Sequence, residues 1–295
     1  EGEFGLYDDK FIDCLCLLSR SIKRYDSLIF AQLFHGGMRA PEHLTGFQPI
    51  TASRTICKES KSGYTRMASD HDIWRIIQDF TSAAVRCVES GFDGIELHGA
   101  HGYLISQFLS KTINKRTDKW GGDINGRSQF LIEIVKSIKN NVPENFIVGI
   151  RLSPEIEELN ISLEDSIKLI RKVKTMGLDF IHLSCWDIYA PSLQYPKDPK
   201  RIAEWITHSI DNLPPIISTG KIWSAEDAQN AIDQGADLVG VARAAIPYPD
   251  WAKNIEETKY NPPKAPFSVQ QLQDAELSAP FINYMRKWKS FVEDD

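Results

Sequence analysis

The sequence predicts a (β/α)8 barrel, in which parallel strands alternate with the helices that cover them. Two observations support this. Short apolar runs alternate with amphipathic helical patterns, as they do around parallel sheets. A Gly-x-Asp motif also recurs between a helix and the next strand, at residues 91–93, 177–179 and 235–237. A doubly wound open sheet is the second choice, and it is weakened because no Gly-x-Gly-x-x-Gly motif follows any strand.

The apolar runs predict six strands, at residues 28–33, 92–97, 146–152, 180–183, 216–217 and 238–242. Between them, apolar residues recur at spacings of three and four, which is typical of amphipathic helices. Three of these helices begin with a Ser-x-x-Asp capping box, at Ser69, Ser162 and Ser224. Another helix, from Phe11 to Ile22, precedes the first strand. The polar segment 41–68 is expected to be one long loop, and long loops are often functional.

Six strands are two fewer than a full barrel needs. At roughly 30 residues per strand–helix unit, about 60 residues would be missing, and the chain begins at Glu1 without a methionine. We therefore expect a barrel that lacks its first two strand–helix units. Residues 1–260 would form this partial barrel, which would bind the cofactor. Residues 261–295, with apolar positions such as Phe281 and Met285, would form a C-terminal helical extension.

The composition limits the kinds of partner and the cellular location that we expect for this protein. The chain has 34 Lys and Arg against 40 Asp and Glu, a net charge of −6. Nucleic-acid-binding proteins usually carry a basic face, so we expect no nucleic-acid partner. No run of about 18 apolar residues occurs, so no membrane span is expected. The five cysteines form no Cys-x-x-Cys pair, which favours a reducing, cytoplasmic location over a secreted disulfide scaffold.

Candidate catalytic residues follow the strand at 92–97, because barrel enzymes place their chemistry at the carboxyl ends of strands. His98, His101 and Tyr103 gather there. They could be structural loop residues, a metal site, or two histidines that bind a substrate oxygen beside a tyrosine that donates a proton. A metal site needs three or four ligands. Since no acidic residue or cysteine lies at a matching spacing, we expect no metal.

A candidate phosphate site follows the last two strands. The loops after strands 7 and 8 of such barrels commonly bind phosphate. Small residues there let backbone N–H groups approach an anion, and an arginine can add a bidentate contact. The residues concerned are Gly220, Lys221, Ala242 and Arg243. Arg243 could instead lie on the surface of a helix.

Two further polar residues end apolar strands. Arg151 closes the run FIVGIRL, and a buried arginine is costly unless it faces an anion or another polar partner. Gln32 ends the first strand and offers both a donor and an acceptor. With the phosphate loops, these residues fit a ligand that has a phosphate at one end and a polar, hydrogen-bonding ring. Flavin mononucleotide (FMN) is such a ligand.

Several motifs resemble the old yellow enzyme family of FMN-dependent ene-reductases, also described as NADH:flavin oxidoreductases. The resemblance runs from Gly5 to about Trp251. The motifs are QLFHGG at 32–37, GFDGIELHGAHGYL at 91–104, NKRTDKWGG at 114–122 and GVAR at 240–243. Ala242 departs from the family pattern, which usually has glycine there. Met38-Arg39 and Gly126-Arg127 also depart from it, and nothing matches the family's first strand.

The resemblance implies the following assignments. FMN would be the cofactor and NAD(P)H the reductant, with Gln32 on the pyrimidine edge and Arg151 near flavin N1. The phosphate would bind at Gly220, Lys221, Ala242 and Arg243. The substrate carbonyl oxygen would bind His98 and His101, and Tyr103 would protonate the substrate. Arg116, Asp118 and Arg127 would only shape the loops.

The leading hypothesis is therefore an FMN-dependent oxidoreductase that reduces the C=C bond of α,β-unsaturated carbonyl compounds with NAD(P)H. Its partner would be a small enone-type substrate, and the protein could also form a homo-oligomer. One alternative is a phosphate-binding barrel lyase or isomerase, for which Lys221 is the one lysine at a strand end. The other is a non-enzymatic truncated barrel that binds a ligand or a partner.

Overall fold

The structure, a computed structural model, describes residues 4–293. Its main sheet has six parallel strands in the order β1-β4-β5-β6-β7-β8, so that each strand pairs with the strand of the same sheet that follows it along the chain. The strand predictions are confirmed, with ends that shift by a residue or two. The strands are β1 (Phe30–Leu33), β4 (Gly94–Gly99), β5 (Ile147–Leu152), β6 (Phe180–Ser184), β7 (Ile216–Thr219) and β8 (Leu238–Gly240).

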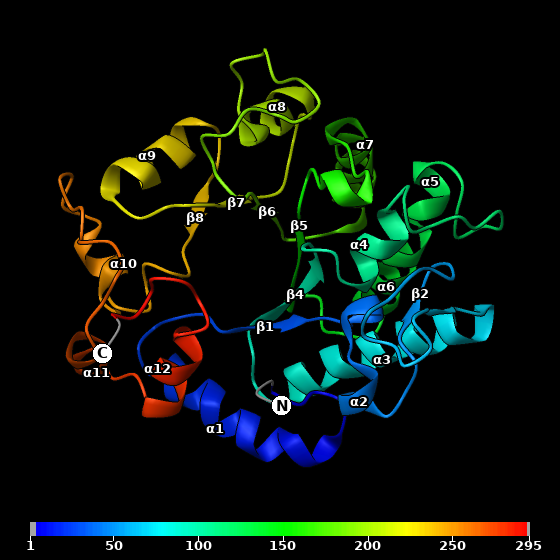
Figure 1. Ribbon diagram of the computed structural model, residues 1–295, viewed down its shortest axis with the longest axis horizontal. Coiled ribbons are helices and arrows are strands. Elements are labelled where there is room, and N and C mark those ends of the chain that lie inside the picture. Colours follow the sequence, from blue (N-terminus) through cyan, green and yellow to red (C-terminus); the bar gives the residue numbers. More distant parts are fainter. Residues whose placement is uncertain (1–3, 294–295) are drawn as a thin grey trace.

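Helices surround the curved sheet, and the main hydrophobic core lies between the two layers (Figure 1). The predicted capping serines are confirmed, since Ser69, Ser162 and Ser224 each accept a hydrogen bond from the N–H three residues later. The principal helices are α1 (Ile12–Lys23), α3 (Asp70–Glu89), α6 (Gln129–Lys139), α7 (Leu163–Val173), α8 (Ile202–Ser209) and α9 (Ala225–Asp233).

The sheet curves like a barrel but does not close. Within residues 4–293, β1 pairs only with β4 and β8 only with β7. Leu238, on the edge strand β8, has 54% of its surface exposed. The architecture is the partial α/β barrel that the strand count predicts. No helix in this described part of the chain is long and apolar enough to cross a membrane.

The Gly-x-Asp repeat has a clear structural role. Its glycines have φ values of +73°, +75° and +97°, the left-handed region in which a helix commonly ends. The aspartate carboxylates then accept a backbone N–H near the start of the neighbouring strand. The three bonds are Ile29 to Asp93, Val148 to Asp179 and Ile216 to Asp237, at 2.8–2.9 Å. Each motif ends a helix and also fixes the next strand beside its neighbour.

The prediction of one unbroken loop at 41–68 is wrong. This segment contains α2 (Glu42–Thr45) and a small parallel sheet of β2 (Ile50–Thr51) and β3 (Arg66–Met67). Arg116 supports it by donating to the carbonyls of Ala52 and Ala68. Elements of two to four residues are too short for periodicity to reveal. Other short helices are α4 (Leu104–Leu109), α5 (Ile124–Arg127), α10 (Trp251–Asn254) and the 3-10 turns Asp9–Phe11, Gly37–Arg39, Glu157–Leu159 and Lys174–Met176.

The C-terminal segment has a small core of its own. It contains α11 (Val269–Asp274) and α12 (Ala279–Met285), and Phe267 and Met285 are buried in it. The Phe267 ring stacks on Trp223, with centroids 6.2 Å apart, and so attaches this core to the loop before α9. The helical character is as expected, and the domain boundary at 260/261 stays a prediction.

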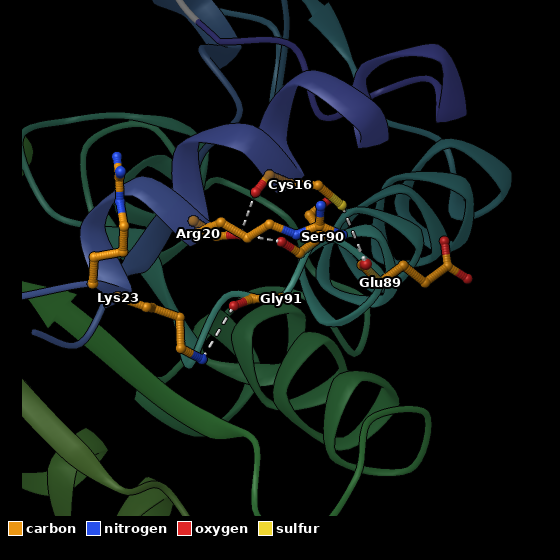
Figure 2. Close-up of a pocket in the computed structure, with 8 residues that line it drawn as sticks. Cys16, Arg20, Lys23, Glu89, Ser90 and Gly91 are labelled. Atoms are coloured by element: carbon orange, nitrogen blue, oxygen red, sulfur yellow. Dashed lines mark hydrogen bonds between the residues drawn. The ribbon is translucent and has the colours of Figure 1, made fainter. Parts of the chain in front are cut away.

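Helix α1 is held against the end of α3 around a cavity of about 450 Å³ (Figure 2). Ser19 donates to the Ser90 carbonyl at 2.6 Å, and Lys23 donates to the carbonyl of Gly91 at 3.4 Å. Gly91 comes just before β4, so this cavity lies toward the amino ends of the strands. The candidate catalytic residues follow the carboxyl ends, and the cavity is not part of their site.

Candidate active site

The inner face of the sheet carries its side chains in layers, because alternate residues of each strand point inward. The layer nearest the amino ends is apolar. The rings of Phe30 and Phe180 meet edge to face, with centroids 5.7 Å apart. They fit because β5 has a glycine between them, since a Cβ on Gly149 would lie only 2.1 Å from the Phe180 ring. This layer forms an apolar floor under the site.

The second layer is a chain of polar side chains. Gln32 Nε2 donates to Glu96 at 2.5 Å, and the other Glu96 oxygen lies 2.7 Å from His182 Nδ1. His182 Nε2 in turn lies 2.7 Å from the Thr219 hydroxyl. Burial alone would raise the pKa of Glu96, but its hydrogen bond to His182 and the further contacts with Gln32 and Arg151 hold it below its usual range. The Gln32 carboxamide is thereby fixed, and within residues 4–293 its own oxygen accepts no hydrogen bond.

The third layer, at the carboxyl ends, holds the predicted catalytic residues. The rings of His98 and His101 lie at a steep angle with centroids 4.9 Å apart. Arg151, which pairs with His98 across β4 and β5, donates to Ser184 at 3.0 Å. Two buried atoms of this layer, His98 Nδ1 and Arg151 Nε, have no hydrogen-bond partner among the described residues. Buried polar atoms are normally satisfied, so this layer is suited to a polar ligand.

Both histidines are neutral at pH 7. Burial is the main cause, and the positive charge of Arg151 adds to it. Together they lower the pKa of His98 to about 3 and that of His101 to about 4. Burial also lowers the pKa of Arg151. Neutral imidazoles can donate one N–H each to a carbonyl oxygen without bringing a second positive charge beside the arginine.

The stability of the protein is expected to fall as the pH falls from 7 to 5. His98 stays neutral in the native state, whereas an unfolded histidine takes up a proton near pH 6.5. Unfolding is therefore favoured below that pH, by about 1.4 kcal/mol per pH unit for such a group. Urea unfolding at both pH values measures the slope. His98→Gln should reduce it, and the control His208→Gln, at an exposed position, should not. Equal slopes for His98→Gln and wild type would contradict this account.

Tyr103 stands beside the two histidines. Its ring centroid lies 5.0 Å from that of His98 and 5.3 Å from that of Phe34. The Arg39 guanidinium lies 4.9 Å above the ring. Tyr103 also borders a cavity of about 750 Å³ that Phe34 and Arg39 line in part. The three residues predicted from the sequence, His98, His101 and Tyr103, thus come together, and Tyr103 is the one of them that lines this cavity.

The predicted phosphate residues lie in two neighbouring loops, because Thr219 pairs with Gly240 at the ends of β7 and β8. Gly220 has φ +155°, and a Cβ there would lie 2.5 Å from the carbonyl oxygen of Cys185, so only glycine fits. Within the described chain, no hydrogen bond occupies the backbone N–H groups of Gly220, Lys221, Ala242 and Arg243. Free N–H groups in such turns suit an anion.

The charged side chains of these loops differ from one another. Lys221 is ion-paired with Asp187 at 2.8 Å, so its ammonium is already engaged. Arg243 is exposed and has no ion pair within residues 4–293. An anion here would therefore be held by backbone N–H groups and by Arg243. These residues fit FMN, since the free N–H groups suit its phosphate and the unpaired atoms of the third layer suit its polar ring.

The sequence predicted that His98, His101 and Tyr103 lie together, but it missed Ser184, which contacts His101, and the Glu96–His182 pair, which holds Gln32. Glu96 lies two residues before His98, and Ser184 lies two residues after His182. Strand alternation therefore puts all four on the inner face. That spacing is a signal that could have found Glu96, His182 and Ser184. In the part of the chain that the structure describes, no cluster of three or more His, Cys, Asp or Glu could hold a metal.

Fold and site together are those of an α/β barrel suited to a flavin. Comparison with known proteins identifies the family to which the chain belongs. The chain matches the NADH:flavin oxidoreductase / NADH oxidase family over residues 1–261. In fold it resembles an old yellow enzyme homologue from Zymomonas mobilis, with a TM-score of 0.77 and 23% identity over 93% of this chain and 81% of that one. The chain belongs to the NADH:flavin oxidoreductase family, that of old yellow enzyme. FMN is the cofactor of this family.

Two relatives of the chain have names that describe different activities. The chain is 33% identical to an NADH:fumarate oxidoreductase of Klebsiella pneumoniae over 86% of its own length. It is 31% identical to a multifunctional alkene reductase/demethylase of Caballeronia cordobensis over 87% of its length. The chain spans only 28% of the first relative and 39% of the second. The activities of those longer proteins therefore cannot be assigned to this chain from the similarity alone.

Proposed function

We propose that this chain forms the active site of an FMN-dependent oxidoreductase that uses NAD(P)H to reduce the C=C bond of α,β-unsaturated carbonyl compounds. The observation that carries the proposal is the third layer of the sheet. Two neutral histidines and a tyrosine lie there beside a partly buried arginine, and His98 and Arg151 each have a buried nitrogen with no partner among residues 4–293. The names of the two relatives, for fumarate and for alkenes, agree with reduction of a carbon–carbon double bond.

The cofactor residues would act as follows. Bound FMN supplies hydride transfer from a nicotinamide to the substrate. Gln32, whose amide nitrogen is held by Glu96, would present its free oxygen to a ring N–H. Arg151 would place its positive charge beside the polar edge of the ring. The phosphate would be held by Arg243 and by the N–H groups of both loops.

The substrate residues would divide two tasks. His98 and His101 would each donate an N–H to the carbonyl oxygen and stabilise the negative charge that develops on it, the usual effect of oriented donors. Tyr103 would deliver a proton to the carbon next to the carbonyl group, because a tyrosine hydroxyl can act as a general acid. The apolar layer of Phe30 and Phe180 would exclude water from beneath.

The lyase or isomerase alternative has weaker support. A lysine that forms a Schiff base must lose its proton, and burial or a neighbouring cation usually makes this possible. Lys221 has the opposite surroundings, since it is 61% exposed and paired with Asp187. Borohydride trapping with a carbonyl substrate should therefore label no lysine. A non-enzymatic role would be supported by the open sheet edges and excluded by turnover.

We also propose a cytoplasmic location. Sedimentation of the purified protein would measure whether it forms a homo-oligomer.

The test combines binding with turnover. We expect the purified protein to be yellow, or to become yellow on titration with FMN and to quench its fluorescence. With FMN bound, it should oxidise NADH or NADPH in the presence of 2-cyclohexenone. The variant Arg151→Met should bind FMN more weakly, and the surface variant Lys136→Met should not. Wild-type protein that binds no FMN at saturating concentration, or that binds it and reduces no enone, contradicts the proposal.

A further inference from the structure

Ser184 occupies a bridging position in the site. It ends β6, is only 7% exposed, and points its hydroxyl at two groups from other segments. Its Oγ lies 2.7 Å from His101 Nε2 and 3.0 Å from Arg151 Nη2. One hydroxyl thus connects the residue proposed to bind the substrate oxygen with the residue proposed to face the cofactor ring.

The direction of these two hydrogen bonds follows from counting hydrogens. A guanidinium only donates, so Ser184 must accept from Arg151. Toward His101 the hydroxyl could either donate or accept. If it accepted there too, its own hydrogen would need a third partner, and the described structure provides none. A buried hydroxyl hydrogen left without a partner is costly. Ser184 therefore donates to His101 Nε2.

We propose that Ser184 is a positioning residue that fixes His101 in the tautomer protonated at Nδ1, so that the Nδ1–H is the donor offered to the substrate oxygen. A neutral imidazole has one donor and one acceptor nitrogen. Because Nε2 accepts the serine hydrogen, Nδ1 must carry the ring proton. The role in substrate binding rests on the function proposed above, whereas the tautomer is a property of this chain.

The backbone of His101 is built to hold this arrangement. His101 has φ +58°, a conformation that non-glycine residues adopt only when their surroundings enforce it. Its N–H donates to the Ser153 hydroxyl at 3.2 Å, and its carbonyl accepts from Arg39 at 2.6 Å. Ser184 adds a third point of attachment, on the ring. A donor fixed in this way needs no reorganisation when charge develops on the substrate.

Nitrogen-15 NMR of the full chain, with and without FMN, tests the tautomer directly. Long-range ¹H–¹⁵N spectra distinguish an imidazole nitrogen that bears hydrogen from one that does not. The chain has seven histidines, and His101→Asn identifies the His101 signals by their loss. We expect wild-type His101 at pH 7 to show hydrogen on Nδ1 and none on Nε2. Ser184→Ala should give a mixture of tautomers, and Ser184→Thr, which keeps the hydroxyl, should restore the single form.

Kinetics provide the second readout. Ser184→Ala should lower kcat/KM for an enone by about 10–100-fold, less than the roughly 10²–10³-fold that removal of a whole oriented donor costs. Ser184→Thr should recover most of this loss. Ser166→Ala is the matched control, because Ser166 is also buried and donates to a carbonyl, that of Pro154, but makes no hydrogen bond to His101 or Arg151. It should change neither the His101 spectrum nor kcat/KM.

The outcomes separate the two proposals. Wild-type His101 with hydrogen on Nε2, or an unchanged His101 spectrum in Ser184→Ala, overturns the role of Ser184 even if the protein reduces enones. Wild-type protein that shows the expected tautomer but binds no FMN overturns the proposed function and leaves the tautomer assignment standing. A Ser184→Ala protein that no longer folds is replaced in the test by Ser184→Cys, whose weak S–H donor should also give mixed tautomers.

Discussion

Replacing Tyr103 by phenylalanine is expected to slow the reduction of an enone by about 10²–10⁴-fold, the usual contribution of a positioned general acid. Reduction of the bound FMN by NAD(P)H should stay nearly unchanged, since that step requires no proton from Tyr103. Stopped-flow traces of the two half-reactions measure both rates separately.

The structure makes Tyr103→Phe a clean substitution. Within residues 4–293 the Tyr103 hydroxyl makes no hydrogen bond, so its loss breaks no contact in the protein. The ring contacts with Phe34 and His98 and the stacking of Arg39 do not involve the hydroxyl. Tyr103 also begins α4 through backbone bonds that phenylalanine keeps. A large change in rate would therefore reflect chemistry.

Two comparisons sharpen the Tyr103 experiment. Nitroalkenes give a stable anionic product, so their reduction should suffer less than that of an enone. His98→Ala should raise KM for the enone as well as lower kcat, because it removes a group proposed to bind the carbonyl oxygen. An enone rate that is the same in Tyr103→Phe and wild type would remove Tyr103 from the mechanism.

Replacing Arg127 by methionine is expected to destabilise the fold by about 3–5 kcal/mol, the usual cost of removing one partner of a buried ion pair. Arg127 lies on α5, is 2% exposed, and pairs with Asp165 of α7 at 2.8 Å. It also donates to the carbonyls of Gly122 and Leu109. Methionine keeps much of the volume but takes the guanidinium donor away from both carbonyls and leaves Asp165 with Lys111 as its charged partner.

Urea unfolding at pH 7 measures the effect of Arg127→Met as a shift in midpoint. Lys136→Met is the matched control, because it removes an exposed ion pair with Glu133, and such pairs contribute about 0–1 kcal/mol. Lys111 also contacts Asp165, at 2.7 Å, so Lys111→Met/Arg127→Met should be less stable than either single variant. Equal midpoints for Arg127→Met and Lys136→Met would show that the buried pair does not stabilise this fold.

The arrangement of strands and principal helices could be predicted because it is encoded locally. Each strand is a short apolar run, and three helix starts show the same Ser-x-x-Asp pattern. The Gly-x-Asp repeat also marks the turn from a helix to the next strand. The segment around β2 and β3 could not be predicted, because the contacts that shape it come from Arg116, far along the chain.

In the functional site, too, some features are encoded locally in the sequence and others depend on residues far apart in the chain. His98, His101 and Tyr103 are close in sequence, so their grouping could be predicted from one motif. The contacts of Ser184 with His101 and Arg151 join residues 83 and 33 positions apart, and Glu96 meets His182 across 86 positions. Such contacts depend on the register between strands, which single-sequence patterns do not specify.

The strand order of the sheet also has a consequence for folding. Every strand pairs with the strand that comes next along the main sheet, from β1 to β8. Each pairing therefore closes a chain segment no longer than one strand-to-strand crossover, and the entropy lost in closing a segment grows with its length. The sheet can be assembled by stepwise addition of neighbours, and β4, β6 and β8 are each fastened beside the preceding strand by an aspartate at the end of the crossover that leads to them.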